Sequence, residues 1–271
     1  MGFLRMQGAS LRAWEERMDV AMMQPAFMPW QGYFELIYRS EIFIFLDDFQ
    51  FSVQSYHQRN RLFINSGRVG WCTVPVDKKL SFKEPLNRAR INEQTGWRSK
   101  MWISIESNYR KAAYFKDFSP ILKEWLAEKQ GSLSDLNMSF IKKICDLLGL
   151  KREFRLSSER PTSLKRSQRV IDLLNWCDAK RYFCAKGAFG YMLDDGIFPC
   201  EKIEVLFQDF VPKQYAQINC DGSFIPHLSI VDPIMNVGPK ETLQLIKGGT
   251  LKWQGWDEMK KALKELQGEN L

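Results

Sequence analysis

The alternation of apolar and polar residues in the N-terminal third of the chain predicts a strand, a short helix and a second strand. Residues 19–25 form a short apolar run that stops at a proline, which cannot donate to a strand ladder. Residues 29–41 carry apolar side chains at helical spacing behind Pro29, a residue suited to a first helical turn. Residues 42–51 form a continuous, strand-like apolar run, as expected for a strand covered on both faces. This order predicts a βαβ unit of a mainly parallel sheet.

The remainder of the chain alternates between strand-like and helical patterns. Two apolar runs on either side of Ser66-Gly67 predict a β-hairpin. Between residues 97 and 150 the apolar positions recur every three or four residues, which predicts helices. Further strands are expected at 152–159, 181–192 and 203–210, and further helices at 167–180, 240–249 and 256–267.

Together these elements predict an α/β fold with a mainly parallel, Rossmann-like sheet flanked by helices and a helical insertion in the middle of the chain. A length of 271 residues fits one large domain. We expect a flexible N-terminal extension over 1–18, an α/β domain over 19–250 with the insertion at about 97–150, and a C-terminal helix over 251–271. Met18, directly before the first strand, is an alternative start of the protein.

Composition and charge narrow the class of protein. The formal net charge of +7 suits phosphorylated ligands, an anionic membrane surface or nucleic acid, and it equally fits a solvated basic surface. The six cysteines form no CxxC pair and the chain has two histidines, which argues against a zinc site. Reduced thiols, the lack of a signal-peptide pattern and the lack of a membrane-length apolar run predict a cytoplasmic protein without a membrane span.

Polar residues follow the predicted strands at the positions where open α/β sheets bind their ligands, the carboxyl ends of the strands. Gln24 ends the first strand, and Asp47, Asp48 and Gln50 end the second. The glycines of residues 186–191 could also cradle a phosphate. We interpret them as a turn or bulge, because no helical pattern follows at the required spacing.

The chemistry of Asp47 and Asp48 allows two interpretations. One or two carboxylates together with a substrate phosphate can hold Mg²⁺, but no third acidic ligand is close in the sequence, so we predict no metal. Alternatively, a carboxylate pairs with Arg59 or Arg61. These arginines also suit a diphosphate, because guanidinium is planar, always charged and bidentate.

His57 is the candidate catalytic base. Transfer of a group to an amine requires removal of a proton, and histidine titrates in the appropriate range. A loop position after a strand favours this role, although a structural loop histidine would look the same in the sequence. His227 is open to the same two interpretations. Gln24 and Asn60 could hydrogen-bond a sugar or an amide, because each carries both a donor and an acceptor.

Several short elements of the chain occur together in one known family. They are Gln24-Pro25, Pro29-Trp30-Gln31-Gly32-Tyr33-Phe34, Asp47-Asp48-x-Gln50, Arg59-Asn60-Arg61, residues 73–76 and Ser229-Ile230-x-Asp232-x-x-x-Asn236-x-Gly238. With these elements the chain resembles, over residues 19–247, the WbqC-like family, whose members are commonly encoded among bacterial O-antigen and surface-polysaccharide genes. Val53 departs from the pattern, because many members have a basic or polar residue there.

The resemblance implies a transferase that attaches an acyl or aminoacyl group, such as glycine, to a nucleotide-linked amino sugar. The donor would be an acyl-CoA or an aminoacyl-tRNA, which makes tRNA a possible partner. A non-catalytic protein that binds a nucleotide, RNA or a partner enzyme is the alternative. The catalytic candidates are His57, Asp47 and Asp48, and the substrate-binding candidates are Gln24, Trp30, Tyr33, Gln50, Arg59, Asn60, Arg61, Ser229, Asp232 and Asn236.

Three distant segments, 24–33, 47–61 and 229–238, are expected to meet around one ligand at the carboxyl edge of the sheet, because parallel strands end on the same edge. In this arrangement Asp47 would orient His57 or hold the acceptor amine. Arg59 and Arg61 would hold the diphosphate of the ligand.

Overall fold

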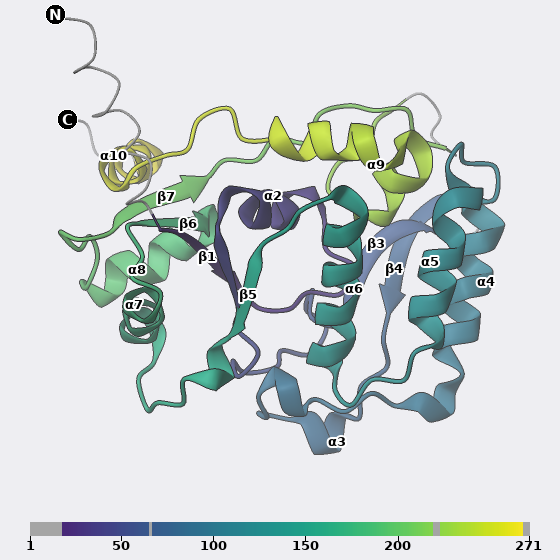
Figure 1. Cartoon of the computed structure of the whole chain (residues 1–271), viewed down its shortest axis with the longest axis horizontal. Helices are drawn as coiled ribbons and strands as arrows, with labels where there is room; N and C mark the ends of the chain where they lie inside the picture. The colour runs from purple at the N-terminus through teal and green to yellow at the C-terminus, as the bar shows by residue number, and fades with distance from the viewer. Residues whose placement is uncertain (1–17, 65–66, 219–222, 268–271) are drawn as a thin grey trace, which may run out of the picture.

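The computed structural model describes residues 18–64, 67–218 and 223–267 and has a five-stranded parallel sheet at its centre (Figure 1). The strands are β1 (Asp19–Met23), β2 (Ile42–Phe45), β5 (Glu153–Leu156), β6 (Arg181–Ala185) and β7 (Glu204–Gln208). Their order in the sheet is β5-β2-β1-β6-β7, so the chain builds outward from β1 first on one side and then on the other. This is the strand order of doubly wound folds. The predicted α/β class with a parallel sheet is confirmed.

Helices cover both faces of the sheet, and the alternation of side chains along β1 explains why. Ala21 points into one hydrophobic core, which also contains residues of α2 (Gln31–Arg39), α6 (Leu133–Leu148) and α9 (Val231–Lys247). Val20 and Met22 point into the other core, and this face is covered by three further helices (Figure 1). They are α7 (Arg166–Trp176), α8 (Phe189–Asp195) and α10 (Trp256–Gln267).

The chain between β2 and β5 forms a second body of structure packed against α2 and α9. It contains the antiparallel hairpin β3 (Arg59–Ile64) and β4 (Arg68–Thr73), and three helices besides α6. They are α3 (Lys78–Ser81), α4 (Trp97–Tyr109) and α5 (Phe115–Ala127).

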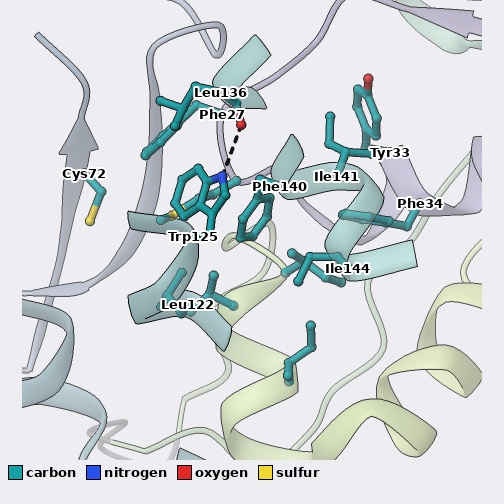
Figure 2. Close-up of a cluster of buried hydrophobic side chains, with 14 of the residues drawn as sticks. Phe27, Tyr33, Phe34, Cys72, Leu122, Trp125, Leu136, Phe140, Ile141 and Ile144 are labelled. Carbon is teal, nitrogen blue, oxygen red and sulfur yellow. Dashed lines mark hydrogen bonds between the residues drawn. The ribbon is translucent and has the colours of Figure 1, made fainter. Parts of the chain in front are cut away.

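An aromatic cluster joins this second body to the first core (Figure 2). The ring of Trp125 lies 4.8 Å from that of Phe140 and 6.0 Å from that of Phe27, measured between centroids. Its indole Nε1–H donates to the carbonyl of Leu136 at 3.2 Å, so the polar end of the buried side chain is satisfied. Because Phe27 belongs to the loop after β1, this packing positions that loop.

The predicted strand over 181–192 is wrong in its second half. β6 ends at Ala185, and a 3₁₀ turn (Lys186–Ala188) leads directly into α8. Phe189 and Met192 are three residues apart and both buried, as the inward face of a helix requires. The premise that no helix follows these glycines was therefore also wrong.

The boundaries of two other elements differ from the prediction. β2 ends at Phe45, so Asp47 and Asp48 lie in the turn after the strand. α9 begins at Val231 rather than near residue 240, and the chain bends within it at Gly238, whose φ is +80°. Glycine tolerates this conformation, and the following Pro239 restricts the backbone before it, so the helix continues past a local break.

Part of the predicted organisation falls outside the described residues. Met18 is the residue of the proposed extension over 1–18 that the structure describes. Ser66, at the predicted hairpin turn, and Cys220 lie outside the described residues. The proposed domain boundaries stay predictions.

Across the described ranges, the helices lack the combination of length and apolar character needed to cross a lipid bilayer.

Candidate functional site

A pocket of about 610 Å³ opens at the carboxyl end of β1. We call it the His57 pocket. Its walls come from the loop after β1 and the start of α2 (residues 23–33), from residues 52–61 leading into β3, and from His227. Two of the three segments expected to meet therefore do so here. Ser229, from the third, lies beside the pocket, where it forms a β-bridge with Trp30.

His57 is held by hydrogen bonds on both ring nitrogens. Its Nδ1 accepts from the backbone N–H of Ser52 at 3.3 Å, and its Nε2 lies 2.9 Å from Oε1 of Gln24. Since Nδ1 accepts, the ring proton is on Nε2 and is donated to Gln24. Burial lowers the pKa of His57 to about 4, so the ring is neutral at neutral pH. In this geometry neither nitrogen has a lone pair free to take a substrate proton.

The bond from His57 fixes the direction of the Gln24 side chain. Because Oε1 accepts from the imidazole, the opposite end of the amide presents its two N–H donors. Within the described chain, Nε2 of Gln24 makes no hydrogen bond, and Gln24 lines the pocket. Tyr33 supports the same turn, because its hydroxyl donates to the backbone carbonyl of Gln24 at 3.2 Å.

Aromatic side chains form much of the pocket wall. Trp30 packs against Phe210 and His227, with ring centroids 5.0 and 4.9 Å apart. Gly32 is required beneath it, because a Cβ there would lie 2.5 Å from the indole ring. Tyr56 stands at the mouth with about half of its surface exposed, at 52%. Flat rings of this kind suit the face of a nucleobase or a sugar.

Arg61 is the cationic side chain of the pocket. Its Nη2 donates to the carbonyls of Pro226 and His227, at 3.3 and 3.4 Å, which ties β3 to that loop. Burial and then the charge of Arg61 lower the pKa of His227. No ion pair in the described part of the structure involves Arg61, and no lining residue is acidic. The pocket therefore favours an anionic or neutral ligand.

Asn60 lines the pocket, whereas its neighbour Arg59 does not. Asn60 is buried and donates from Nδ2 to the carbonyls of Phe27 and Met28, at 3.1 and 2.9 Å, which holds the loop after β1 in place. Arg59 lies outside the pocket, and its guanidinium stacks on the ring of Trp71 at 4.3 Å.

Asp47 and Asp48 face away from the His57 pocket. Asp47 accepts from Asn87 at 3.1 Å and from the backbone and hydroxyl of Ser158, at 3.0 and 2.7 Å. Asp48 accepts from Ser157 and from Arg169, the latter at 3.3 Å. The expected contacts to His57, Arg59 and Arg61 are therefore wrong. The pairing of β2 with β5 is the reason, since it aligns Phe45 with Leu156 and brings the turn beside Ser157.

The polar candidate residues of α9 belong to a buried network and not to the wall of the His57 pocket. Asp232 is fully buried and accepts from Tyr109, Tyr215 and Gln217, at 2.7, 2.5 and 3.0 Å. Burial raises the pKa of Asp232, and these hydrogen bonds oppose the shift. Asn236 accepts from the backbone N–H of Ile218 at 3.0 Å. The network holds α4, α9 and residues 215–218 together.

The candidates thus divide into two groups. Those that line the His57 pocket are Gln24, Trp30, Tyr33, His57, Asn60 and Arg61. Those that do not are Asp47, Asp48, Gln50, Arg59, Ser229, Asp232 and Asn236. Among lining residues, Ser52, Ser55 and Tyr56 were not predicted, although their place between Gln50 and His57 was a usable signal.

The chain matches a known protein family. The WbqC-like protein family matches residues 24–244, a range that contains all but Met23 of the lining residues. The chain belongs to this family. The uncharacterized protein Rv1507c of Mycobacterium tuberculosis is 32% identical to this WbqC-like chain over 221 residues, which are 81% of the chain and 94% of that protein. No solved structure matches the chain significantly.

Proposed function

We propose that this WbqC-like protein transfers an acyl or aminoacyl group to the amine of a nucleotide-linked amino sugar, in the biosynthesis of a surface polysaccharide such as O-antigen. The observation that carries the proposal is the composition of the His57 pocket. It combines the guanidinium of Arg61, which has no acidic partner in the described structure, with aromatic walls and the oriented amide of Gln24. A nucleotide sugar presents the matching groups, namely a flat base, a diphosphate and polar sugar atoms.

Each lining group has a role in this proposal. Arg61 pairs with the diphosphate, because a guanidinium can bind phosphate oxygens in a bidentate manner. Trp30 and Tyr56 pack against the base or the sugar. The N–H groups of Gln24 donate to a sugar oxygen or to the carbonyl oxygen of the transferred group, and neutral His57 keeps the amide in that orientation.

The contacts favour direct transfer over a covalent acyl-enzyme. Burial raises the pKa of the Cys184 and Cys72 thiols, which disfavours the nucleophilic thiolate. The imidazole of His57 accepts from the backbone N–H of Ser52, and the Ser55 hydroxyl contacts the backbone N–H of His57 rather than its ring. The imidazole therefore forms no nucleophile–base pair with Ser52 or Ser55. The sugar amine would attack the carbonyl of the donor directly, and the amine proton would pass to solvent.

Substitution of Arg61 tests the placement of the diphosphate. We expect Arg61→Gln to weaken the binding of UDP- or dTDP-linked amino sugars at least about tenfold, the usual effect of losing a charge-assisted contact. Isothermal titration calorimetry measures this. Arg59→Gln is the matched control, because Arg59 precedes Arg61 by two residues on β3 and lies outside the pocket. Equal losses in both variants, or no binding of any nucleotide sugar to the folded wild type, would overturn the proposal.

A further inference from the structure

A second pocket, of about 640 Å³, adjoins the first across the end of β1. We call it the Cys184 pocket. Met23 and Gln24 line both pockets, so the end of β1 separates them. The other walls of the Cys184 pocket come from β6, from the turn after β2 and from helices α7 and α8.

The Cys184 pocket lies at the carboxyl ends of β1 and β6, where this strand order creates a crevice. From β1 the chain continues to β2 and β5 on one side, and it returns to β6 and β7 on the other. The connections that leave β1 and β6 run to opposite faces of the sheet, with α2 on one face and α8 on the other. Ligands of doubly wound folds bind outside the carboxyl ends of the strands at this point.

The walls of the Cys184 pocket are largely apolar. Met22, Leu46, Val170 and Cys184 contribute aliphatic or sulfur-containing side chains, of which the sulfur-containing ones adapt well to a flexible apolar group. Its polar side chains include Gln24, at the junction with the first pocket, and Arg166, which is 59% exposed. No acidic residue is among the described residues that line it.

The charges argue against a ligand with a buried ammonium group. Asp195 is the acidic partner of Arg166, and the two side chains form an ion pair at 2.8 Å. Asp195 also accepts a hydrogen bond from the Ser167 hydroxyl at 2.7 Å, so it is not free to bind an ammonium group. An ammonium in the apolar part would lose its hydration without gaining a carboxylate partner. An uncharged acyl group would bury its methylene groups against the same walls at no such cost.

We propose that the Cys184 pocket binds the acyl group of the donor, and that this donor is an uncharged aliphatic acyl thioester rather than an aminoacyl ester. The inference rests on the proposed function, since it assumes that the nucleotide sugar occupies the His57 pocket. The thioester carbonyl then lies at Gln24, the residue that both pockets share.

The reaction at this junction balances without an oxidant or reductant. The lone pair of the sugar amine forms a C–N bond with the carbonyl carbon of the thioester. The C–S bond breaks, and the sulfur leaves with the electron pair and takes up a proton. The amine loses one proton, so the products are an amide and a free thiol.

Two thioesters of nearly equal shape test the class of donor. Propionyl-CoA and glycyl-CoA differ in a terminal methyl group against an ammonium group. By calorimetry we expect propionyl-CoA to bind at least about tenfold more tightly than glycyl-CoA, and octanoyl-CoA at least about tenfold more tightly than CoA alone. Equal or tighter binding of glycyl-CoA would overturn the inference.

Substitutions in the pocket test its location. Ala188→Phe should fill the Cys184 pocket and remove the advantage of octanoyl-CoA over CoA, while nucleotide-sugar binding persists. Tyr191→Ala should enlarge the pocket and increase the preference for octanoyl-CoA over propionyl-CoA, which keeps the test decisive if Ala188→Phe does not fold. Both residues line this pocket and not the first. Unchanged acyl preference in folded variants would overturn the inference.

The same experiments separate this inference from the proposed function. If nucleotide sugars bind in an Arg61-dependent way while acyl preference ignores Ala188 and Tyr191, the Cys184 pocket is wrongly assigned and the proposed function survives. If acyl-CoA binding follows Ala188 and Tyr191 while no nucleotide sugar binds, the proposed function fails and the acyl site stands.

Discussion

Gln24 lies where the two pockets meet, and a single hydrogen bond from His57 sets the direction of its amide. The neutral state of His57 matters for this arrangement, because a protonated ring would turn Nδ1–H toward the N–H of Ser52. A histidine whose two nitrogens are already occupied is better suited to positioning a neighbour than to accepting a substrate proton. We therefore assign His57 the role of positioning Gln24.

Replacement of His57 should reveal this role. We expect His57→Phe to weaken nucleotide-sugar binding about three- to tenfold at pH 7, because the Gln24 amide loses the bond that orients it.

The stability of the protein should also depend on pH through His57. The pKa of His57 is about 4 in the folded protein, below its usual value of 6.5. The neutral ring therefore contributes to the free energy of unfolding in full above pH 6.5, and this contribution is lost as the pH falls toward 4.

Urea unfolding of both proteins at pH 7 and pH 4.5 measures the second effect. The loss of stability that His57 causes between pH 7 and pH 4.5 is about 2 kcal/mol, and His57→Phe should remove that part of the wild-type pH dependence. If both proteins lose stability equally as the pH falls, or if the variant binds nucleotide sugar as the wild type does, His57 does not act as assigned.

At the scale of elements, buried polar contacts decide which segments surround the pockets. Asp232 at the start of α9 connects α4, through Tyr109, with the segment that carries Tyr215. The Tyr109 hydroxyl itself accepts from the backbone N–H of Phe63, so its proton is directed to Asp232. α9, the hairpin and α4 are thereby joined through one carboxylate.

Substitution of that carboxylate should cost stability. Asp232→Asn places an N–H₂ group against the donors from Tyr109, Tyr215 and Gln217, and at least one loses its acceptor. We expect the free energy of unfolding to fall by about 1–3 kcal/mol, measured by chemical denaturation. Asp257→Asn, in the exposed first turn of α10, is the control and should change it by less than about 0.5 kcal/mol. An Asp232→Asn protein as stable as the control would show that the network contributes nothing.

The elements that the sequence predicted well are those whose apolar pattern is local. β1, β2 and α2 were found because continuous runs and helical spacing are visible within a few residues. α8 was missed because Gly187 and Gly190 obscure a short helix that its packing against the sheet stabilises. The contacts of Asp47 with Ser157 and Ser158 were missed because these serines lie 110 and 111 residues away, in the 3₁₀ turn directly after β5, and strand pairing of that range leaves no local signal.

The whole molecule places two pockets of similar size on either side of β1, and its strand order produces this arrangement. Part of the His57 pocket could be predicted from the sequence, because Gln24 directly follows a strand, whereas Asp47, Asp48 and Gln50 were expected there and lie elsewhere. The Cys184 pocket could not, since its methionine, valine and cysteine side chains have the same pattern as an ordinary core. Two adjacent sites with one shared amide are what a direct transfer between two bound substrates requires.

Product formation tests this account most directly. Purified protein is incubated with pairs of UDP- or dTDP-linked amino sugars and acyl-CoA thioesters, and the products are identified by mass spectrometry. The account predicts a nucleotide sugar heavier by one acyl group together with an equal amount of free CoA, and loss of both with Arg61→Gln. Folded wild-type protein that binds both substrates and yields no acylated sugar from any pair would contradict it.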